Sequence, residues 1–546
     1  MKTVRWIVAG AVAAALVGCG AEEIVSPGTG GNITINNPPA TTPVTPVDPV
    51  PTGVTPAASC PSLGNGQSLD NHATITGPTG TYRVCALPTR ITSSATLVRL
   101  PGVLYSLPGR VDVGNDLGAV ATTGEVGVTL TVNPGVIVFA ETGTSWLAVN
   151  RGNKLIAIGT AAKPVVFTSR ENVLGQATDS SQGQWGGVVL LGRAPITDCR
   201  LAGQVPGVDC ERQTEGSVDP AFFGGAVATD NSGTLDYVQI RYSGYILGDG
   251  IELQALTLEG TGSGTKIDHF QSFNSSDDGI EIFGGRTSPR RMVLIGADDD
   301  SLDVDTGYQG TIQYVLGVQK TAGAADSVIE LDTAGSNTTT DENQQPRTKL
   351  KLANFTFIHA NPANGNGAAM LFRGKADATL INGIVTTQTA CLRLVNTASG
   401  SILTADAAVG KDGPPLFRSV DLQCGTAAQF VGSGVPAFPM TAADVSTAFG
   451  SGTNSNNSAY VSTFTGGFTP GATENALVAT DPKRGGNPAL PATDAANTAY
   501  AGFDTTTYVG AIKTGDTWHV GWTCNSATAN FGTTSTACTT LPSLAD

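Results

Sequence analysis

Basic residues are few in this sequence. Its 546 residues include 30 Lys and Arg against 45 Asp and Glu, which gives a formal net charge of −15 at pH 7. An acidic surface repels nucleic acid and anionic lipid, so the composition predicts a protein without a nucleic-acid partner. Cations, neutral or basic surfaces and other proteins are the remaining classes of partner.

Histidine is scarce as well, and metal-binding cysteine pairs are absent. The sequence has 4 histidines and no C-x-x-C pair, which argues against a zinc or redox site. His269 is the histidine closest in sequence to the acidic stretches, and we predict a structural role for it. Four tyrosines are scattered along the sequence, so we expect no aromatic cleft from them; they are Tyr237, Tyr242, Tyr308 and Tyr314.

Amphipathic helical stretches of useful length are missing between about residue 110 and residue 430. Instead, short β-branched runs such as "GVTLTVNPGVIVFA" alternate with turns, and glycine is abundant at 69 residues. This pattern indicates an all-β fold with many short strands. Both a β-sandwich and a solenoid fit it, and a fixed repeat would favour the solenoid.

Two acidic hexapeptides supply that repeat. "DDGIEI" at residues 277–282 is followed by "DDSLDV" at residues 299–304, and weaker copies lie at residues 248–253 and 326–331. A period in the twenties fits the coils of a parallel β-helix. Alternation along each strand then predicts four inward-pointing side chains, namely Ile280, Ile282, Leu302 and Val304.

The acidic residues of the repeats are predicted to form a ladder on one outer face. Coils stack about 4.7–4.9 Å apart, which would align Glu252, Glu281, Asp303 and Glu330. Like charges about 5 Å apart repel by roughly 3 kcal/mol at an effective dielectric constant of 20, which favours a bound cation or a raised pKa. Oxygen ligands without sulfur suit Ca²⁺.

The candidate Ca²⁺ ligands are Asp277, Asp278, Glu281, Asp298, Asp299, Asp300, Asp303 and Asp305. In the other interpretation these aspartates cap turns through their own backbone amides, and the outward acids are solvated. Both interpretations remain open at the level of sequence.

Catalysis is a further use of these acids. "NSSDDGIEI" resembles the paired-aspartate strand of polygalacturonases, which makes Asp277, Asp278 and Glu281 candidate catalytic residues. The basic residues that could serve a lyase are Lys266, Arg286, Arg290 and Arg291. However, the sequence has neither the Gly-His-Gly nor the Arg-Ile-Lys signature of polygalacturonases, and its acidity disfavours a polyanionic substrate.

The N-terminus predicts export. Lys2 and Arg5 flank the start of an apolar run that is too short to cross a bilayer, as in a signal peptide. "LVGC" resembles the bacterial lipobox, in which Cys19 becomes the lipidated N-terminus. Gly20 after the cysteine implies the outer membrane. We therefore predict a lipid-anchored protein that faces the cell surface or the periplasm.

The other eight cysteines are an even number, which in an exported chain predicts disulfides. The simplest pairing joins sequence neighbours: Cys60 with Cys85, Cys199 with Cys210, Cys391 with Cys424, and Cys524 with Cys538. The predicted domains are a signal peptide (1–18), a Pro/Thr-rich tether (19–57), a disulfide-closed lead-in (58–105), a parallel β-helix (106–430) and an irregular cap over the last coils (431–546).

Longer stretches resemble a group of secreted bacterial β-helix proteins with a pectin-lyase-like fold. These stretches include "GTAAKPVVFTS", "GQWGGVVLLGRAPI" and the C-terminal "FDTTTYVGAIKTGDTWHVGWTC". The resemblance implies a right-handed parallel β-helix on the cell surface and carries no settled activity, because a fold alone does not define chemistry.

From these features we expect a non-enzymatic surface lipoprotein. It would present a rigid β-helix, stiffened by Ca²⁺, to a glycan or a surface protein. The alternatives are a carbohydrate-active enzyme, either a polysaccharide lyase or a glycoside hydrolase, and an accessory lipoprotein of an outer-membrane transporter.

Overall fold

The computed structural model describes residues 53–544, apart from residues 65, 202, 215–216, 218–219, 249–250, 322, 324, 334–341, 361–366, 426–427 and 485–499. The predicted signal peptide (1–18), Cys19 and most of the predicted tether (19–57) lie outside the described residues. Among the residues that are described, no helix has the length and apolar character needed to cross a membrane.

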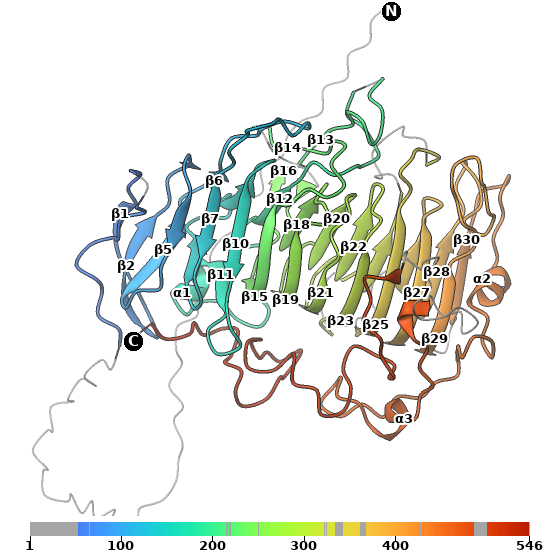
Figure 1. Ribbon diagram of the computed structural model, residues 1–546. Helices are drawn as coiled ribbons and strands as arrows, with labels where there is room; N and C mark the ends of the chain where they lie inside the picture. Colours follow the sequence, from blue (N-terminus) through green and yellow to red (C-terminus); the bar gives the residue numbers. More distant parts are fainter. Residues whose placement is uncertain are drawn as a thin grey trace, which may run out of the picture. The chain divides into compact units, whose positions relative to one another are not determined.

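The chain winds into stacked coils, and the strands of successive coils form two long sheets (Figure 1). Sheet A contains β1 (Asp70–Gly77), β2 (Gly80–Ala86), β4 (Ala95–Leu97), β5 (Val103–Leu107), β7 (Thr129–Val132), β8 (Ile137–Ala140), β10 (Lys154–Ile158), β11 (Val165–Ser169), β15 (Gly233–Arg241), β19 (Lys266–Phe273), β21 (Arg290–Ile295), β23 (Thr311–Val318), β25 (Lys349–His359), β27 (Asp377–Thr387) and β29 (Leu416–Gln423).

Sheet B contains β3 (Arg90–Ile91), β6 (Arg110–Val113), β9 (Trp146–Val149), β12 (Gly187–Leu191), β18 (Leu256–Glu259), β20 (Ile280–Phe283), β22 (Leu302–Asp305), β24 (Ile329–Leu331), β26 (Ala368–Phe372), β28 (Ala390–Val395) and β30 (Phe430–Ser433). Two short hairpins stand apart from the sheets: β13 (Arg212–Gln213) with β14 (Phe222–Phe223), and β16 (Ile246–Gly248) with β17 (Ile251–Glu252). The helices are α1 (Arg170–Val173), α2 (Ala442–Phe449), α3 (Ala472–Asn475) and the 3-10 helix η1 (Pro482–Arg484).

Neighbouring strands in both sheets are parallel, except for the antiparallel pair of β1 and β2. The chain alternates between the sheets as it advances, so the fold is the predicted right-handed parallel β-helix. The first coil begins earlier than predicted. β2 already pairs in parallel with β5, because the Cys60–Cys85 region leads straight into the solenoid.

The repeat and its inward residues are confirmed. Ile280, Ile282, Leu302 and Val304 are fully buried in one continuous core. In sheet B, Glu281 lies opposite Asp303, which in turn lies opposite Glu330. The prediction that Glu252 aligns with Glu281 is wrong, because Thr257 of β18 occupies the position next to Glu281. Glu252 instead ends the antiparallel hairpin β16–β17, which interrupts the repeat.

One residue in each long strand of sheet A adopts a left-handed conformation and turns the chain. In the coil below, β10 and β11 are separate strands that both pair with β15, on either side of this turn. The turning residues align from coil to coil and are Tyr237, His269, Arg291, Tyr314, Asn354, Asn382 and Ser419, with φ between 43° and 65°. This conformation costs roughly 1–2 kcal/mol for most residues other than Gly, Asn and Asp.

The last coil is covered by α2. Phe449 of α2 is buried against Phe417 and Phe430, with ring centroids 5.3 and 5.6 Å apart. The irregular C-terminal cap is therefore confirmed at this end. An open end would otherwise expose core and strand edges.

We expected the whole C-terminal region to lie over the last coils, but the segment beyond α2 does not. Residues 500–544, here named the C-terminal strap, run back along sheet A toward the first coils (Figure 1, red). Side chains on the outer face of sheet A hold it. Asn354 donates to the carbonyl of Tyr508 at 3.0 Å, and Arg241 donates to that of Cys538 at 2.8 Å. Such bonds satisfy the backbone of an irregular segment.

The four predicted disulfides are present. Their Cα–Cα distances are 5.5 Å for Cys60–Cys85, 5.0 Å for Cys199–Cys210, 5.3 Å for Cys391–Cys424 and 4.8 Å for Cys524–Cys538. The last of these closes a loop within the strap.

Candidate functional site

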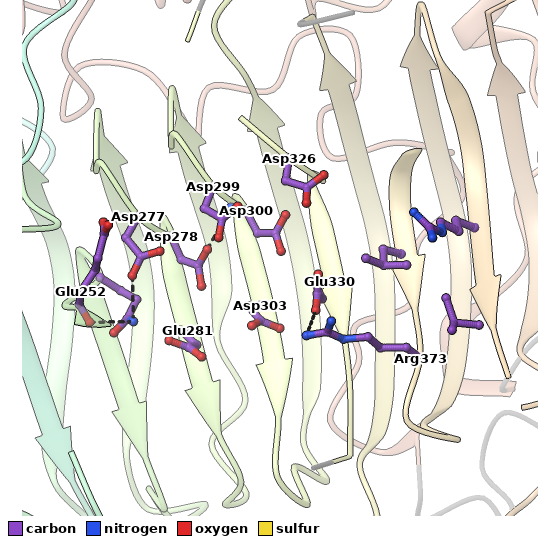
Figure 2. Close-up of a pocket in the computed structure, with 14 residues that line it drawn as sticks. Glu252, Asp277, Asp278, Glu281, Asp299, Asp300, Asp303, Asp326, Glu330 and Arg373 are labelled. Atoms are coloured by element: carbon purple, nitrogen blue, oxygen red, sulfur yellow. Dashed lines mark hydrogen bonds and ion pairs between the residues drawn. The ribbon is translucent and has the colours of Figure 1, made fainter. Parts of the chain in front are cut away.

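The outer face of sheet B contains a cleft of about 510 Å³, here named the acidic cleft (Figure 2). Its lining is dominated by carboxylates and includes two arginines. The lining residues are Glu252, Gln254, Asp277, Asp278, Glu281, Asp299, Asp300, Asp303, Asp326, Glu330, Leu371, Arg373, Arg393 and Val395. The acids of several coils thus converge on one site.

Strand alternation supplies one column of these acids. The neighbours of Glu281, Asp303 and Glu330 along β20, β22 and β24 fill the core, so the three carboxylates point outward in register. The three strands belong to successive coils, which stack at the spacing of hydrogen-bonded strands. This column is the part of the site that the repeat predicted.

The turns before these strands supply a second column. Asp278 accepts a hydrogen bond from the backbone amide of Asp300 at 2.9 Å, and Asp300 accepts one from the amide of Ser327 at 2.6 Å. Asp278 and Asp300 therefore link each turn to the next coil, rather than capping their own turn. Figure 2 shows Asp277, Asp299 and Asp326 beside this column.

Burial and mutual repulsion raise the pKa of these carboxylates. Burial is the larger cause for Asp278, Asp300 and Asp303, whose pKa values lie well above the ordinary value for aspartate. Burial also raises the pKa of Glu330 to about 7, although Arg373 opposes the shift. The pKa of Asp299 rises to about 6 through desolvation and nearby acids, but its exposed side chain lets solvent screen the effect.

Arg373 neutralises one end of the acidic cleft. Its guanidinium pairs with Glu330 and, at 2.9 Å from Nε to Oδ2, with Asp332. Figure 2 shows Arg373 beside Glu330, whereas Glu281 and Asp278 lie toward the other end. At that other end, Asp278, Glu281 and Asp303 each offer an oxygen, and these oxygens lie within 4.8 Å of one another. Asp277, Asp278 and Asp299 form a second such group.

Most of the predicted site residues come together. Asp277, Asp278, Glu281, Asp299, Asp300 and Asp303 all line the acidic cleft. Asp298 and Asp305 do not. Asp298 lies 3.4 Å from the ammonium of Lys320. Asp305 is buried at the end of β22, where burial and the charge of Asp332 raise its pKa.

The basic residues suggested for a lyase are absent from the lining of the acidic cleft. Arg290 pairs with Asp504 of the strap, and Arg291 pairs with Asp268 of β19. Both arginines belong to β21 of sheet A, whereas the cleft is on sheet B. These arginines are close to the acids in sequence but not in space, because the chain passes from sheet B to sheet A within each coil.

Four polar residues of the lining were not predicted from the sequence: Gln254, Asp326, Arg373 and Arg393. Arg373 follows β26, one coil after Glu330. The chain between β24 and β26 is longer than the chain between β22 and β24, so the repeat is hard to recognise there. Asp326 precedes "SVIEL" as Asp300 precedes "SLDV", so the weak copy at residues 326–331 already contained the signal for this residue.

Comparison with known proteins gives a family but no individual relative. No curated protein and no solved structure gives a significant match to the chain. Residues 119–469 match the family described as "Pectate-lyase like beta helix domain". This range includes the acidic cleft and most of both sheets. The chain therefore belongs to the pectate-lyase-like β-helix family.

Proposed function

We propose that the acidic cleft binds a divalent cation, preferentially Ca²⁺, and that the protein is a non-enzymatic binding protein. The proposal rests on one observation: oxygens of Asp278, Glu281 and Asp303, from two successive coils, lie within 4.8 Å of one another. Three carboxylates this close repel strongly unless protons or a cation intervene. At neutral pH and millimolar Ca²⁺, the cation is the expected partner.

The hydrogen bonding of Asp303 supports a cation. Its Oδ1 atom is buried and accepts no hydrogen bond from any of the described residues. A buried carboxylate oxygen normally has a donor or a metal, because burial without either costs free energy. A cation between Asp303 and its two neighbours would satisfy this oxygen.

The chemistry of the lining supports Ca²⁺ over other metals. The residues that line the cleft provide carboxylate and amide oxygens but no histidine or cysteine, the ligands that zinc prefers. Ca²⁺ accepts six to eight oxygens in flexible geometry, so carboxylates from different coils suit it. Remaining positions would be open to the hydroxyl or carboxylate groups of a glycan or a surface protein.

The location of this activity is proposed from sequence. The lipobox-like motif would attach Cys19 to the outer membrane, and the Pro/Thr-rich tether after it would separate the β-helix from the lipid. The acidic cleft would then be available to partners at the cell surface or in the periplasm.

Calorimetric titration of the full chain with Ca²⁺ tests the proposal. We expect saturable binding that is weakened about tenfold or more by Asp303→Asn and by Glu281→Gln, since each removes one charge from the ligand group. Asp70→Asn, at an exposed position of β1, is the matched control and should bind as the unaltered chain does. Absence of binding heat, or equal affinity in all variants, would refute the cation site.

A carbohydrate-active enzyme is the second candidate, and the pKa of Glu330 favours it. A carboxyl group with a pKa of about 7 can act as a general acid near neutral pH, and paired carboxyl groups can divide acid and base roles. A reducing-end assay on polygalacturonate and on neutral polysaccharides distinguishes the candidates. We expect no release of cut oligosaccharide. Release that disappears in Glu330→Gln would replace the binding proposal with the enzymatic one.

A further inference from the structure

A second cleft of about 550 Å³ lies between sheet A and the C-terminal strap, and we name it the aromatic cleft. Tyr237, His269, Arg291 and Tyr314 line it from four successive strands, and Tyr508 and Trp518 line it from the strap. The acidic cleft lies on sheet B, so the two sites share no residue.

The backbone at this site is unfavourable for the residues it carries. Tyr237, His269, Arg291 and Tyr314 all have positive φ values, between 43° and 65°. Bulky side chains rarely adopt this conformation, whereas Asn tolerates it. The same column continues with Asn354 and Asn382 in later coils.

The change from bulky residues to Asn coincides with the end of the cleft. Asn354 and Asn382 donate to strap or loop carbonyls, at 3.0 Å to Tyr508 and 2.8 Å to Thr480, and neither lines the cleft. A residue that keeps the turn without strain is thus available to this chain. Strained residues concentrate where side chains have a function, so the four bulky side chains point to a use of the cleft.

The side chains of the cleft are held in defined positions. The rings of Tyr237 and His269 are stacked 4.1 Å apart, and the guanidinium of Arg291 lies 5.7 Å from the centre of the Tyr314 ring. His269 Nδ1 is 2.9 Å from Asp236, and Arg291 pairs with Asp268. Preorganised aromatic and polar groups of this kind lower the entropic cost of binding a ligand.

The strap completes the site with groups that can donate hydrogen bonds. Burial raises the pKa of the Tyr508 phenol, which therefore stays protonated. Nε1 of Trp518 is buried and has no hydrogen-bond partner among the described residues. Asp516 adds a carboxylate at the same edge. The cleft thus combines aromatic faces with both donors and acceptors.

This combination selects one class of ligand. The Arg291 guanidinium disfavours an organic cation, and the carboxylates of Asp236, Asp268 and Asp516 disfavour an anion. A purely aromatic ligand would leave the polar groups without partners. A sugar ring has an apolar C–H face that packs on aromatic rings and a rim of hydroxyls that both donate and accept.

We propose that the aromatic cleft is a binding site for a neutral saccharide, distinct from the acidic cleft. Tyr237, Tyr508 and Trp518 provide packing surfaces, while Arg291 and Asp516 bind hydroxyl groups. The saccharide is bound there non-covalently and is not cleaved. It does not require a cation, so it stands independently of the function proposed for the acidic cleft.

Tryptophan fluorescence and calorimetric titration of the full chain test this site. The probes are neutral hexasaccharides of glucose, galactose, mannose, xylose or N-acetylglucosamine, with hexagalacturonate as the anionic comparison. We expect saturable binding of at least one neutral probe in EGTA. Trp518→Ala and Tyr237→Asn should each weaken it about tenfold or more, as for aromatic residues central to a binding site.

The variants separate a binding role from a structural one. Tyr237→Asn introduces the residue that the same column uses at Asn354, so the turn is preserved. Trp518→Ala alters a partly exposed strap residue. Tyr245→Ala, at a partly buried tyrosine outside the cleft, and Asp303→Asn should leave saccharide binding unchanged. Failure of every neutral probe, or unchanged affinity in both cleft variants, would overturn the proposal.

Discussion

A chain with Met in place of Arg373 is expected to lose about 3 kcal/mol of unfolding free energy at pH 8 without Ca²⁺. The guanidinium of Arg373 compensates Glu330 and Asp332, which are both buried. Without it, two negative charges remain in a site of low polarity beside Asp303. Arg373 is itself 36% exposed, which keeps the loss at the lower end of the range for broken buried ion pairs.

Calorimetric unfolding at pH 8 in EGTA measures this loss. Lys513→Met, at an exposed lysine of the strap, is the matched control and should change the unfolding free energy little. Addition of Ca²⁺ should recover part of the stability of Arg373→Met, because a bound cation replaces the missing positive charge. Equal stability of the two variants would show that the acidic cleft does not depend on Arg373.

The cation-free protein is expected to become less stable as the pH rises from about 4.5 to 7. A carboxyl group with a raised pKa binds its proton more tightly in the folded state than in the unfolded state. Its stabilisation is therefore fully present below the unfolded pKa and is lost as the pH rises through the folded pKa. For Glu330 the folded pKa is about 7, against about 4.3 when unfolded.

The full size of this loss is about 4 kcal/mol from Glu330 alone, because its folded and unfolded pKa values differ by about 2.7 and each unit is worth about 1.4 kcal/mol. Asp278, Asp300 and Asp303 shift in the same direction and add to it. The pKa of Glu474 shifts in the opposite direction. Burial would raise it, but hydrogen bonds from Tyr460 and Thr463 outweigh burial and lower it to about 2. Its contribution is lost as the pH falls toward 2, so stability should be greatest near pH 4.5.

Thermal unfolding between pH 4 and pH 8, in EGTA and in Ca²⁺, measures this dependence. We expect a declining curve in EGTA and a flatter one in Ca²⁺, where the cation replaces the protons. Glu330→Gln removes one of these contributions and should make the curve in EGTA less steep. A melting temperature that is constant or rises between pH 5 and pH 8 in EGTA would contradict the raised pKa values.

The sequence was sufficient for the part of the fold that repeats. Ile280, Ile282, Leu302 and Val304 alternate with acids at a fixed spacing, and this spacing gave both the core and the register of Glu281, Asp303 and Glu330. Each coil meets only its neighbours, so a local pattern carries the long-range information. The same reasoning failed at Glu252, because the hairpin β16–β17 preserves the letters of the repeat without its geometry.

The aromatic cleft was missed for a related reason. Tyr237 and Tyr314 looked scattered, yet they occupy the same position in coils separated by His269 and Arg291. Their alignment is set by one conformation of the backbone rather than by one residue type, and the residue type changes at every step of the column from Tyr237 to Asn354. The strap residues Tyr508 and Trp518 had no repeat to locate them, since only tertiary contacts determine where the strap lies.

The route of the strap has a consequence for how the protein is made. Hydrogen bonds join Arg241 to Cys538 and Thr540, and the backbone of Gly102 to that of Leu544. Residues 538–544 thus contact coils that lie hundreds of residues earlier in the chain. A solenoid that is held by contacts between neighbouring coils alone could unfold locally from either end. The strap adds contacts between distant parts of the chain, which couple the unfolding of the early coils to that of the strap. Folding is therefore complete only when residues 538–544 have docked on these early coils.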